Sequence, residues 1–555
     1  MWRFVLLCLT IYLSGVVLYS ALFVFSANQD PVAQTAKIFV AGAHILVLFV
    51  PVVLAQSRSF VLRALGFILI AGFFIYAVFL VGYFPYFGFV PELYAFDLRN
   101  AQDLGEVSDH YFGQLFGWRE ISLVALFALL IWQVLNTPIP KLGTAILVVP
   151  ALLFVISLHS FGGPSGSEKF GNVTVLRRFG PVVFSYVSLT EWLRLGGGYL
   201  EEPSDYPGKI AQFVKEPGPP KKAFISEIPK VSRVTILQIE SFDTTAIDAR
   251  LSDIPTMPFV SSLRERCLNY QNFFTMKGAG GSSDAEFSIA TGLIPSTRLP
   301  SLKHFDFSRV DTLYEVLASH EIRSTFAHNN QRGFYGRGGA YEQIAALETR
   351  FLDPLDRAEE VDFARDWLSN SLLTSEKSLH YFFNFQSHGP YQGYSVATAE
   401  NFSISRGQDI RVDYLATMSE VDRMIEALFD LQASGFERGE NLFIVMADHP
   451  SYLHATDDEL SRYRIPLMIC HGDFEGVEIP NVFGSIDLFP TILEAFGVPP
   501  RQPVLGQSMF WETRNAVLLP TRDIIRRNSQ GTPEIIPCDA DCDEYFKFTE
   551  QHLKF

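Results

Sequence analysis

Residues 234–241 have the sequence VTILQIES, an apolar run that ends in a carboxylate and a hydroxyl. Comparable short apolar runs occur at 324–327, 381–385, 442–446 and 466–470, and helix-like stretches lie between them at 312–319, 413–431 and 487–496. Buried strands that alternate with helices are typical of an α/β domain, and we expect all five runs to be parallel strands of a mostly parallel sheet. In such sheets the active site forms beyond the carboxyl ends of the strands.

Polar residues follow three of these strands directly. Glu240 follows the first, His388 follows the third within FFNFQSHGPY, and Asp448 and His449 follow the fourth within NLFIVMADH. A single carboxylate at a strand end often only caps the next helix. Three such positions together favour a functional site. A carboxylate, an Asp-His pair and a hydroxyl would form a mixed oxygen and nitrogen ligand set suited to manganese, magnesium or zinc.

The candidate hydroxyl lies in residues 277–293, KGAGGSSDAEFSIATGL. The glycines allow close approach to an anion, and Ser282 is predicted to open a helix that begins near Asp284. The start of a helix offers free N–H groups and positive potential to a phosphate. A metal bound to the same hydroxyl would lower its pKa and make it a nucleophile. Taken alone, Ser282 or Ser283 is more simply interpreted as an ordinary N-cap.

The first 159 residues are dominated by apolar runs with few charges, and a helical span needs about 20 apolar residues. The candidate spans are 4–26, 37–55, 61–84, 121–135 and 142–159. Residues 1–159 are therefore predicted to be a transmembrane domain of about five helices. Arg3, Arg58, Arg63 and Lys141 lie in loops that would be cytoplasmic. An odd number of spans then places everything after residue 159 outside the cytoplasm.

Residues 160–230 are predicted to connect this domain to a catalytic domain at 231–555. Within the connector, 173–195 is amphipathic, and would lie on the outer membrane surface or pack on the soluble domain. The Pro/Gly-rich stretch KEPGPPKK at 215–222 marks the boundary. Cys538 and Cys542 are either a local disulfide or two free thiols. The net charge of −16 argues against a nucleic-acid partner.

From about residue 234 to 498 the order of motifs resembles the sulfatase-like domain of the lipoteichoic acid synthase family, within the alkaline phosphatase superfamily. The segments that carry the resemblance are ESFD, GGSSDAEFSIATG, FYGRGG, QSHGPY, ADH and SIDLFPTILEAFGV. The apolar amino-terminal part and the connector are similar to that family as well. The resemblance implies a multi-pass helical membrane domain followed by an α/β extracytoplasmic domain.

The resemblance also implies roles for individual residues. Glu240, Ser282, Asp448 and His449 would hold a divalent metal, manganese first, with magnesium or zinc as alternatives. Ser282 would be the nucleophile, at a position where the Gram-positive enzymes carry threonine. Arg337 and His388 match positions expected to bind the phosphate and glycerol of the substrate, and His388 would also assist the leaving or entering oxygen.

True sulfatases carry Cys/Ser-x-Pro-x-Arg, whose first residue becomes formylglycine. The corresponding stretch from Ser282 is Ser-Ser-Asp-Ala-Glu, which lacks both proline and arginine. The comparison therefore favours a phosphorylated serine over an aldehyde nucleophile.

The implied activity is transfer of glycerophosphate from phosphatidylglycerol, through a covalent Ser282 intermediate, to a glycan, a glycolipid or a polyglycerolphosphate chain. The alternatives are a phosphoethanolamine transferase, a hydrolase of phosphodiesters or sulfate esters, and a catalytically inactive receptor. Retention of Glu240, Ser282, Asp448 and His449 in one chain counts against the receptor. The expected location is the cytoplasmic (inner) membrane, with the catalytic domain in the periplasm or otherwise outside the cell.

Overall fold

The computed structural model describes residues 2–23, 48–87, 118–137 and 222–537 of the chain, the last range with short gaps at 298–299, 331, 333–336, 353–358, 374–376, 390, 392, 408, 452, 454–458, 503 and 513–514. The chain divides into two compact units, Met1–Tyr199 with Ala455–Glu459, and Leu200–His454 with Leu460–Phe555. The predicted span 142–159, most of the span 37–55, the amphipathic stretch 173–195 and the Cys538–Cys542 pair lie outside the described residues.

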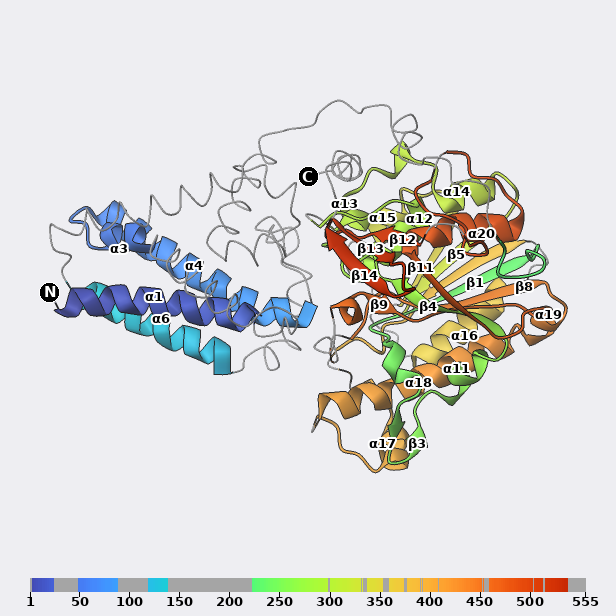
Figure 1. Cartoon of the computed structure of the whole chain (residues 1–555), viewed down its shortest axis with the longest axis horizontal. Coiled ribbons are helices and arrows are strands. Elements are labelled where there is room, and N and C mark those ends of the chain that lie inside the picture. Colours follow the sequence, from blue (N-terminus) through green and yellow to red (C-terminus); the bar gives the residue numbers. More distant parts are fainter. Residues whose placement is uncertain are drawn as a thin grey trace. The chain divides into compact units, whose positions relative to one another are not determined.

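The described part of the first unit is helical (Figure 1). Its helices are α1 (Trp2–Phe23), α3 (Phe49–Ala55), α4 (Phe60–Phe87) and α6 (Trp118–Asn136). Helices α1, α4 and α6 coincide with three of the predicted spans. Among the described residues, one segment, Phe60–Val78 of α4, is long and apolar enough to cross a membrane, whereas the apolar segments Val5–Leu18 and Ile121–Asn136 are shorter. The number and orientation of the spans therefore stay predictions.

A nine-stranded sheet forms the centre of the second unit, in the order β11-β4-β10-β8-β1-β7-β5-β6, with β9 paired to β4. Strands β8, β1, β7, β5 and β6 are mutually parallel, as are β4 and β11. The strands are β1 (Arg233–Ile239), β4 (Cys267–Phe274), β5 (Arg323–His328), β6 (Leu347–Phe351), β7 (Ser378–Phe383), β8 (Asn441–Ala447), β9 (Arg464–Ile465), β10 (Leu467–Cys470) and β11 (Val477–Gly484). The predicted α/β domain with a mostly parallel sheet is confirmed.

Strand β10 departs from the prediction in its direction. It runs antiparallel to both of its neighbours, β4 and β8, so the prediction of a parallel strand at 466–470 is wrong. Among the described residues between β8 and β9, the structure has the three-residue 3-10 helix Leu460–Arg462, whereas parallel neighbours are usually joined by a crossover α-helix.

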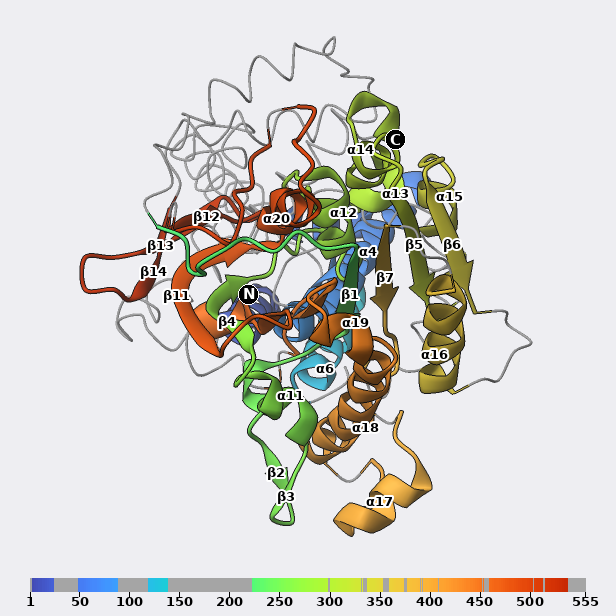
Figure 2. The same ribbon diagram turned by 90° about the vertical axis from the view of Figure 1, so that its right-hand side faces the viewer.

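Helices cover both faces of the sheet (Figures 1 and 2). One layer contains α12 (Ser283–Thr291), α13 (Ser301–His304), α14 (Leu313–Ala318) and α20 (Leu488–Phe496), and the other contains α11 (Pro258–Leu263), α16 (Glu360–Ser371) and α18 (Ile410–Asp430). A capping box between Thr312 and Glu315 starts α14, which satisfies two of its unpaired N–H groups. With both faces covered, the strands β7 and β8 are buried along their whole length, as expected for parallel strands.

Smaller elements complete the second unit. The strands β2 (Arg250–Leu251) and β3 (Ile254–Pro255) form a hairpin, and β12 (Ala516–Leu518), β13 (Asp523–Arg527) and β14 (Pro533–Pro537) form a separate antiparallel sheet. Further α-helices among the described residues of this unit are α15 (Arg337–Tyr341), α17 (Val396–Phe402) and α19 (Ala433–Glu437).

A disulfide joins Cys267 of β4 to Cys470 of β10, which are direct partners in the sheet. Both residues are fully buried, and they are separated by 203 positions in the chain. The sequence offered no local spacing from which this pairing could be predicted.

Candidate active site

The three central strands deliver the site residues to one edge of the sheet. Strand β1 lies between β8 and β7, with Ile239 in register with Ala447. Glu240 therefore leaves the sheet beside Asp448, and the loop that carries His388 follows β7 at the same edge. The carboxyl ends of parallel strands meet at one edge, and this is how residues 208 positions apart come into contact.

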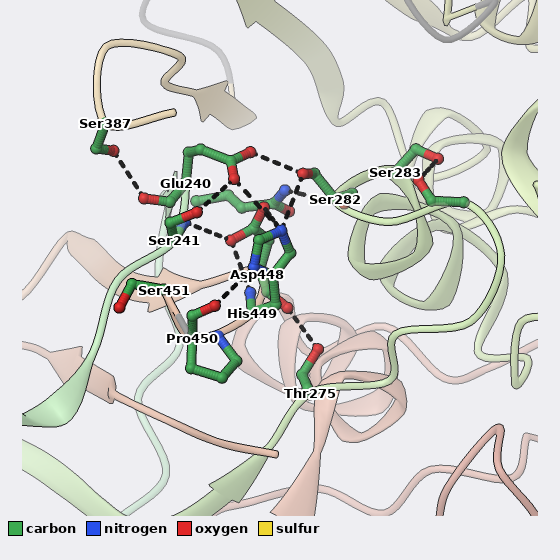
Figure 3. Close-up of polar contacts among 12 residues, drawn as sticks. Glu240, Ser241, Thr275, Ser282, Ser283, Ser387, Asp448, His449, Pro450 and Ser451 are labelled. Atoms are coloured by element: carbon green, nitrogen blue, oxygen red, sulfur yellow. Dashed lines mark hydrogen bonds and ion pairs between the residues drawn. The ribbon is translucent and has the colours of Figure 1, made fainter. Parts of the chain in front are cut away.

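Glu240, Asp448 and His449 form a buried cluster (Figure 3). The His449 Nε2 atom lies 3.3 Å from Glu240 Oε1 and 3.5 Å from Asp448 Oδ2. One potential ligand atom from each residue lies within 4.8 Å of the other two. The arrangement is that of a compact O/O/N ligand set.

Hydrogen bonds fix the atoms of this cluster that face away from its centre. Asp448 Oδ1 accepts from the backbone N–H of Ser241 at 2.9 Å and of His449 at 2.6 Å. His449 Nδ1 lies 2.9 Å from the carbonyl oxygen of Pro450, which can only accept. Nδ1 therefore carries the proton, and Nε2 presents its lone pair to the carboxylates.

The cluster fits a divalent cation. Asp448 Oδ2 is buried and accepts no hydrogen bond from the part of the chain that the structure describes, and His449 Nε2 faces it as a second lone-pair atom. Lone pairs that converge in a buried space repel one another unless a cation lies between them. Two carboxylates and one imidazole are ligands that manganese, magnesium and zinc accept.

The pKa values follow from the same crowding. Burial, and then the neighbouring charge of Asp448, raise the pKa of Glu240. Burial raises the pKa of Asp448 as well. Burial and the nearby Lys277 lower the pKa of His449 to about 3. His449 is therefore neutral at physiological pH, which is the state that a metal ligand requires.

Ser282 points into this cluster. Its Oγ donates a hydrogen bond to Glu240 Oε2 at 2.7 Å and lies 3.4 Å from His449 Nε2. Ser282 occupies the N-cap position of α12, but its side chain makes no capping hydrogen bond. The observed partner is thus a carboxylate of the site, and the simpler interpretation of Ser282 as an N-cap does not describe its side chain.

Ser283 has a different environment. Its Oγ donates to the carbonyl of Gly280 at 2.8 Å and points away from the cluster (Figure 3). The two adjacent serines are therefore distinguishable by their contacts: one faces the site and the other stabilises the loop.

Asp284 holds the glycine-rich loop against the helix. Its Oδ2 accepts from the N–H groups of Gly278 and Gly280 at 2.7 and 2.8 Å. A Cβ on Gly280 would lie 2.4 Å from Asp284 Oδ1, and Gly281 has a φ of 59°, in the left-handed region that favours glycine. These glycines let the chain turn tightly enough to bring Ser282 onto Glu240.

Ser241 has a left-handed backbone conformation, with a φ of 56°. Its N–H is bound to Asp448, and its Oγ donates to Glu240 Oε1 at 2.7 Å. Tyr414 donates to its carbonyl at 3.0 Å. Non-glycine residues persist in this conformation only where surrounding contacts impose it. Here those contacts join the two strand ends that carry the cluster.

Arg337 is almost completely buried, at the start of α15. Its Nη2 and Nε atoms lie 2.6 and 2.9 Å from Glu286 Oε1, and its guanidinium lies 4.9 Å from the centre of the Phe383 ring. Burial lowers the pKa of Arg337, but the charge of Glu286, followed by the smaller effects of Tyr341 and Glu240, outweighs burial and raises it. The structure shows an ion pair for Arg337, which the sequence did not indicate.

His388 lies partly exposed on the loop after β7. Its Nδ1 is 2.9 Å from the carbonyl of Gly389, and its ring stacks on Phe385 at 4.8 Å. His388 is not one of the three buried members of the cluster.

The loop that carries His388 is tied to Glu240. Asn384 Oδ1 accepts from the Glu240 N–H at 2.7 Å, and Ser387 Oγ donates to the Glu240 carbonyl at 2.7 Å. Glu360 of α16 accepts from the N–H groups of Phe385 and Gln386 at 2.6 and 2.9 Å. This network gives the loop a fixed conformation beside the site.

Two further residues lie close to the site and were not singled out in the sequence. Burial lowers the pKa of Lys277 to about 8, against the opposing charges of Asp448, Glu240 and Asp284. His328 ends β5, and its ring stacks on Phe383 at 4.6 Å. The sequence could have indicated His328 as a site residue, because it follows an apolar run as the other candidates do. Nothing in the sequence around Lys277 distinguishes it from an ordinary loop lysine.

Residues 233–498 match the protein-family model described as "Sulfatase". The match covers the region in which the sequence resembles a sulfatase-like domain, and that resemblance is confirmed.

Relatives and solved structures extend the likeness. Over 324 residues the chain is 24% identical to "Lipoteichoic acid synthase 2" of Bacillus subtilis, covering 52% of this chain and 48% of that protein. It therefore spans about half the length of that relative. It is 21% identical to "Lipoteichoic acid synthase" of Staphylococcus aureus over 82% of this chain and 76% of that protein.

Among solved structures, the "integral membrane protein lipooligosaccharide phosphoethanolamine transferase A (EptA)" of Neisseria meningitidis is 12% identical, with a TM-score of 0.51. The match covers 90% of this chain and 96% of that one. At this identity the likeness shows a shared fold.

Proposed function

We propose that this protein is a membrane-anchored, divalent-metal-dependent phosphoglycerol transferase. It moves glycerophosphate from phosphatidylglycerol, through a covalent Ser282 intermediate, to a glycan, glycolipid or polyglycerolphosphate acceptor. The observation that carries the proposal is the hydrogen bond of 2.7 Å from Ser282 Oγ to Glu240, inside the Glu240–Asp448–His449 cluster. The likeness to lipoteichoic acid synthases supports a phospholipid donor and a glycolipid or glycerolphosphate acceptor.

The metal would be held by Glu240, Asp448, His449 and the hydroxyl of Ser282, with manganese as the first candidate and magnesium or zinc as alternatives. When bound, such an ion would lower the pKa of the serine hydroxyl and offset negative charge that develops at phosphorus. Contacts with Ser241 and Pro450 orient Glu240, Asp448 and His449, which supports their assignment as the three buried ligands.

In the first displacement Ser282 Oγ attacks the phosphorus of the donor and transfers its proton to Glu240, which already accepts its hydrogen bond. The bond from phosphorus to the diacylglycerol oxygen breaks, and His388 protonates that oxygen. The products are diacylglycerol and a glycerophosphoryl ester of Ser282. Positioning of nucleophile, base and acid in this order is the usual logic of covalent catalysis.

In the second displacement the acceptor hydroxyl replaces diacylglycerol. It gives its proton to His388 and attacks phosphorus, and the bond to Ser282 Oγ breaks as Glu240 returns the proton to the serine. Arg337 would bind the phosphate oxygens during both steps. Water competes with the acceptor for the same intermediate, so hydrolysis is the side reaction that this site allows.

The proposal includes a multi-pass membrane domain at 1–159, the connector at 160–230 and a catalytic domain at 231–555 on the outer side of the cytoplasmic membrane, in the periplasm. The membrane-length segment Phe60–Val78 supports an anchor. The buried Cys267–Cys470 disulfide supports an oxidising compartment, because disulfides are rare in the cytosol.

Release of diacylglycerol tests the proposal. The full-length protein is incubated with vesicles of phosphatidylglycerol or of phosphatidylethanolamine, with manganese or with EDTA. We expect manganese-dependent release of diacylglycerol from phosphatidylglycerol, and a loss of at least about 10³-fold in Ser282→Ala. Ser283→Ala is the matched control, since Ser283 bonds to Gly280, and should retain most of the activity. Release from phosphatidylethanolamine alone would replace the proposal with phosphoethanolamine transfer.

A further inference from the structure

Glu286 is a fully buried carboxylate on the helix that carries the nucleophile. It lies in the first turn of α12, four residues after Ser282. Its Oε2 accepts from Tyr341 OH at 2.5 Å and from Arg337 Nε at 3.1 Å, and its Oε1 lies 2.6 Å from Arg337 Nη2. A charge so deeply buried persists only with a well-placed partner, and Arg337 is that partner.

The ion pair joins two parts of the site that are far apart in the chain. Arg337 belongs to α15, a five-residue helix, and Glu286 belongs to α12. Helix α13 packs against both α12 and α15. The guanidinium also lies 4.9 Å from the centre of the Phe383 ring. A planar guanidinium held at both Nε and Nη2 has one orientation, so Glu286 fixes the orientation of the Arg337 guanidinium.

The ion pair also affects the charge near the phosphate-binding side chain. Within the pair, the carboxylate of Glu286 balances the guanidinium of Arg337. Removing the charge of Glu286 would add one unit of positive charge next to the phosphate-binding side chain. A phosphodiester carries one negative charge, whereas a phosphomonoester carries two near neutral pH. The buried pair is thus matched to the substrate with the smaller charge.

We propose that Glu286 is a positioning and specificity-determining residue: it fixes the orientation of Arg337 and offsets its charge, so that the site favours phosphodiesters over phosphomonoesters. The inference rests on the proposed function, in which Arg337 binds the phosphate. Glu286 acts through Arg337 and does not itself contact the substrate.

The test compares two chromogenic probes, bis(p-nitrophenyl) phosphate and p-nitrophenyl phosphate, with manganese-loaded full-length protein. In Glu286→Gln we expect the KM for the diester to rise about tenfold, because a charged hydrogen-bond partner of Arg337 is lost. We expect the ratio of kcat/KM for monoester over diester to rise at least about fivefold. The matched control is Glu420→Gln, whose carboxylate bonds to Ser395 and Arg423, and should leave the ratio unchanged.

An equal loss for both probes in Glu286→Gln, with an unchanged ratio, would show that Glu286 is only structural and would overturn the inference. Glu286→Asp keeps the charge and should raise the KM for the diester without changing the ratio of kcat/KM for monoester over diester. The same result is expected for Tyr341→Phe. If Glu286→Gln does not fold, the other two variants decide: an unchanged KM for the diester in both Glu286→Asp and Tyr341→Phe overturns the inference. A wild-type protein that turns over neither probe and releases no diacylglycerol contradicts the proposed function itself, which separates the two failures.

Discussion

We predict that the disulfide between Cys267 and Cys470 stabilises the folded state of the second unit. The bond closes a loop of 203 residues between two adjacent strands. A loop of that length corresponds to about 5 kcal/mol of lost chain entropy in the unfolded state, and measured effects are usually about 2–4 kcal/mol. Removal of the bond in Cys267→Ala/Cys470→Ala should therefore lower the Tm by roughly 4–10 °C.

The assay is thermal unfolding of the detergent-solubilised full chain, at one scan rate, with EDTA present so that metal binding does not contribute. Cys8→Ala is the control, since Cys8 is a free thiol in α1, and its Tm should match the wild type. Each single variant should lose as much as the double variant, because either one breaks the same bond. A double variant with an unchanged Tm, or with a shift equal to the sum of the single shifts, would refute the reasoning.

Three further predictions concern the site. Asp448→Asn should weaken manganese binding by more than about 100-fold, since it removes the charge of a buried ligand; an unchanged Kd by manganese titration would contradict the ligand assignment. His388→Gln should slow diacylglycerol release by about 10²–10⁴ and leave manganese affinity intact, so a parallel loss of both would argue against an acid–base role. Burial raises the pKa of Glu360 to about 7, so the folded state keeps a proton that the unfolded chain loses near pH 4.5, and stability falls as pH rises between those values. The Tm of Glu360→Gln relative to wild type should accordingly increase from pH 5 to 7 and then level off; a gap that is constant with pH would show that Glu360 is ionised when folded.

The strands that carry the site could be predicted because each is a continuous apolar run bounded by polar residues. The run at 234–239 is β1 (Arg233–Ile239), and the run at 442–446 is β8 (Asn441–Ala447). Burial on both faces imposes that pattern on a parallel strand. The polar residues after these runs then had to meet at one edge of the sheet, and the structure brings Glu240, Asp448 and His449 together there.

Long-range pairings could not be predicted in the same way. Cys267 and Cys470 meet only because β4 and β10 are neighbours in the sheet, and neither has a cysteine nearby that would indicate a partner. Glu286 likewise follows Ser282 as one of two acidic residues on α12, and its contact with Arg337 depends on the packing of α15. The direction of β10 was missed for the same reason, since a short apolar run does not reveal which strand lies beside it.

The central claim is that Ser282 carries the transferred group, and peptide mass spectrometry tests it most directly. The full-length protein is exposed to phosphatidylglycerol with manganese or with EDTA, and the peptide that contains Ser282 and Ser283 is fragmented to locate any modification. We expect a manganese-dependent glycerophosphoryl ester on Ser282, absent from Ser283 and absent in Ser282→Ala. An unmodified peptide in protein that releases diacylglycerol, or an ester located on Ser283, would contradict Ser282 as the nucleophile.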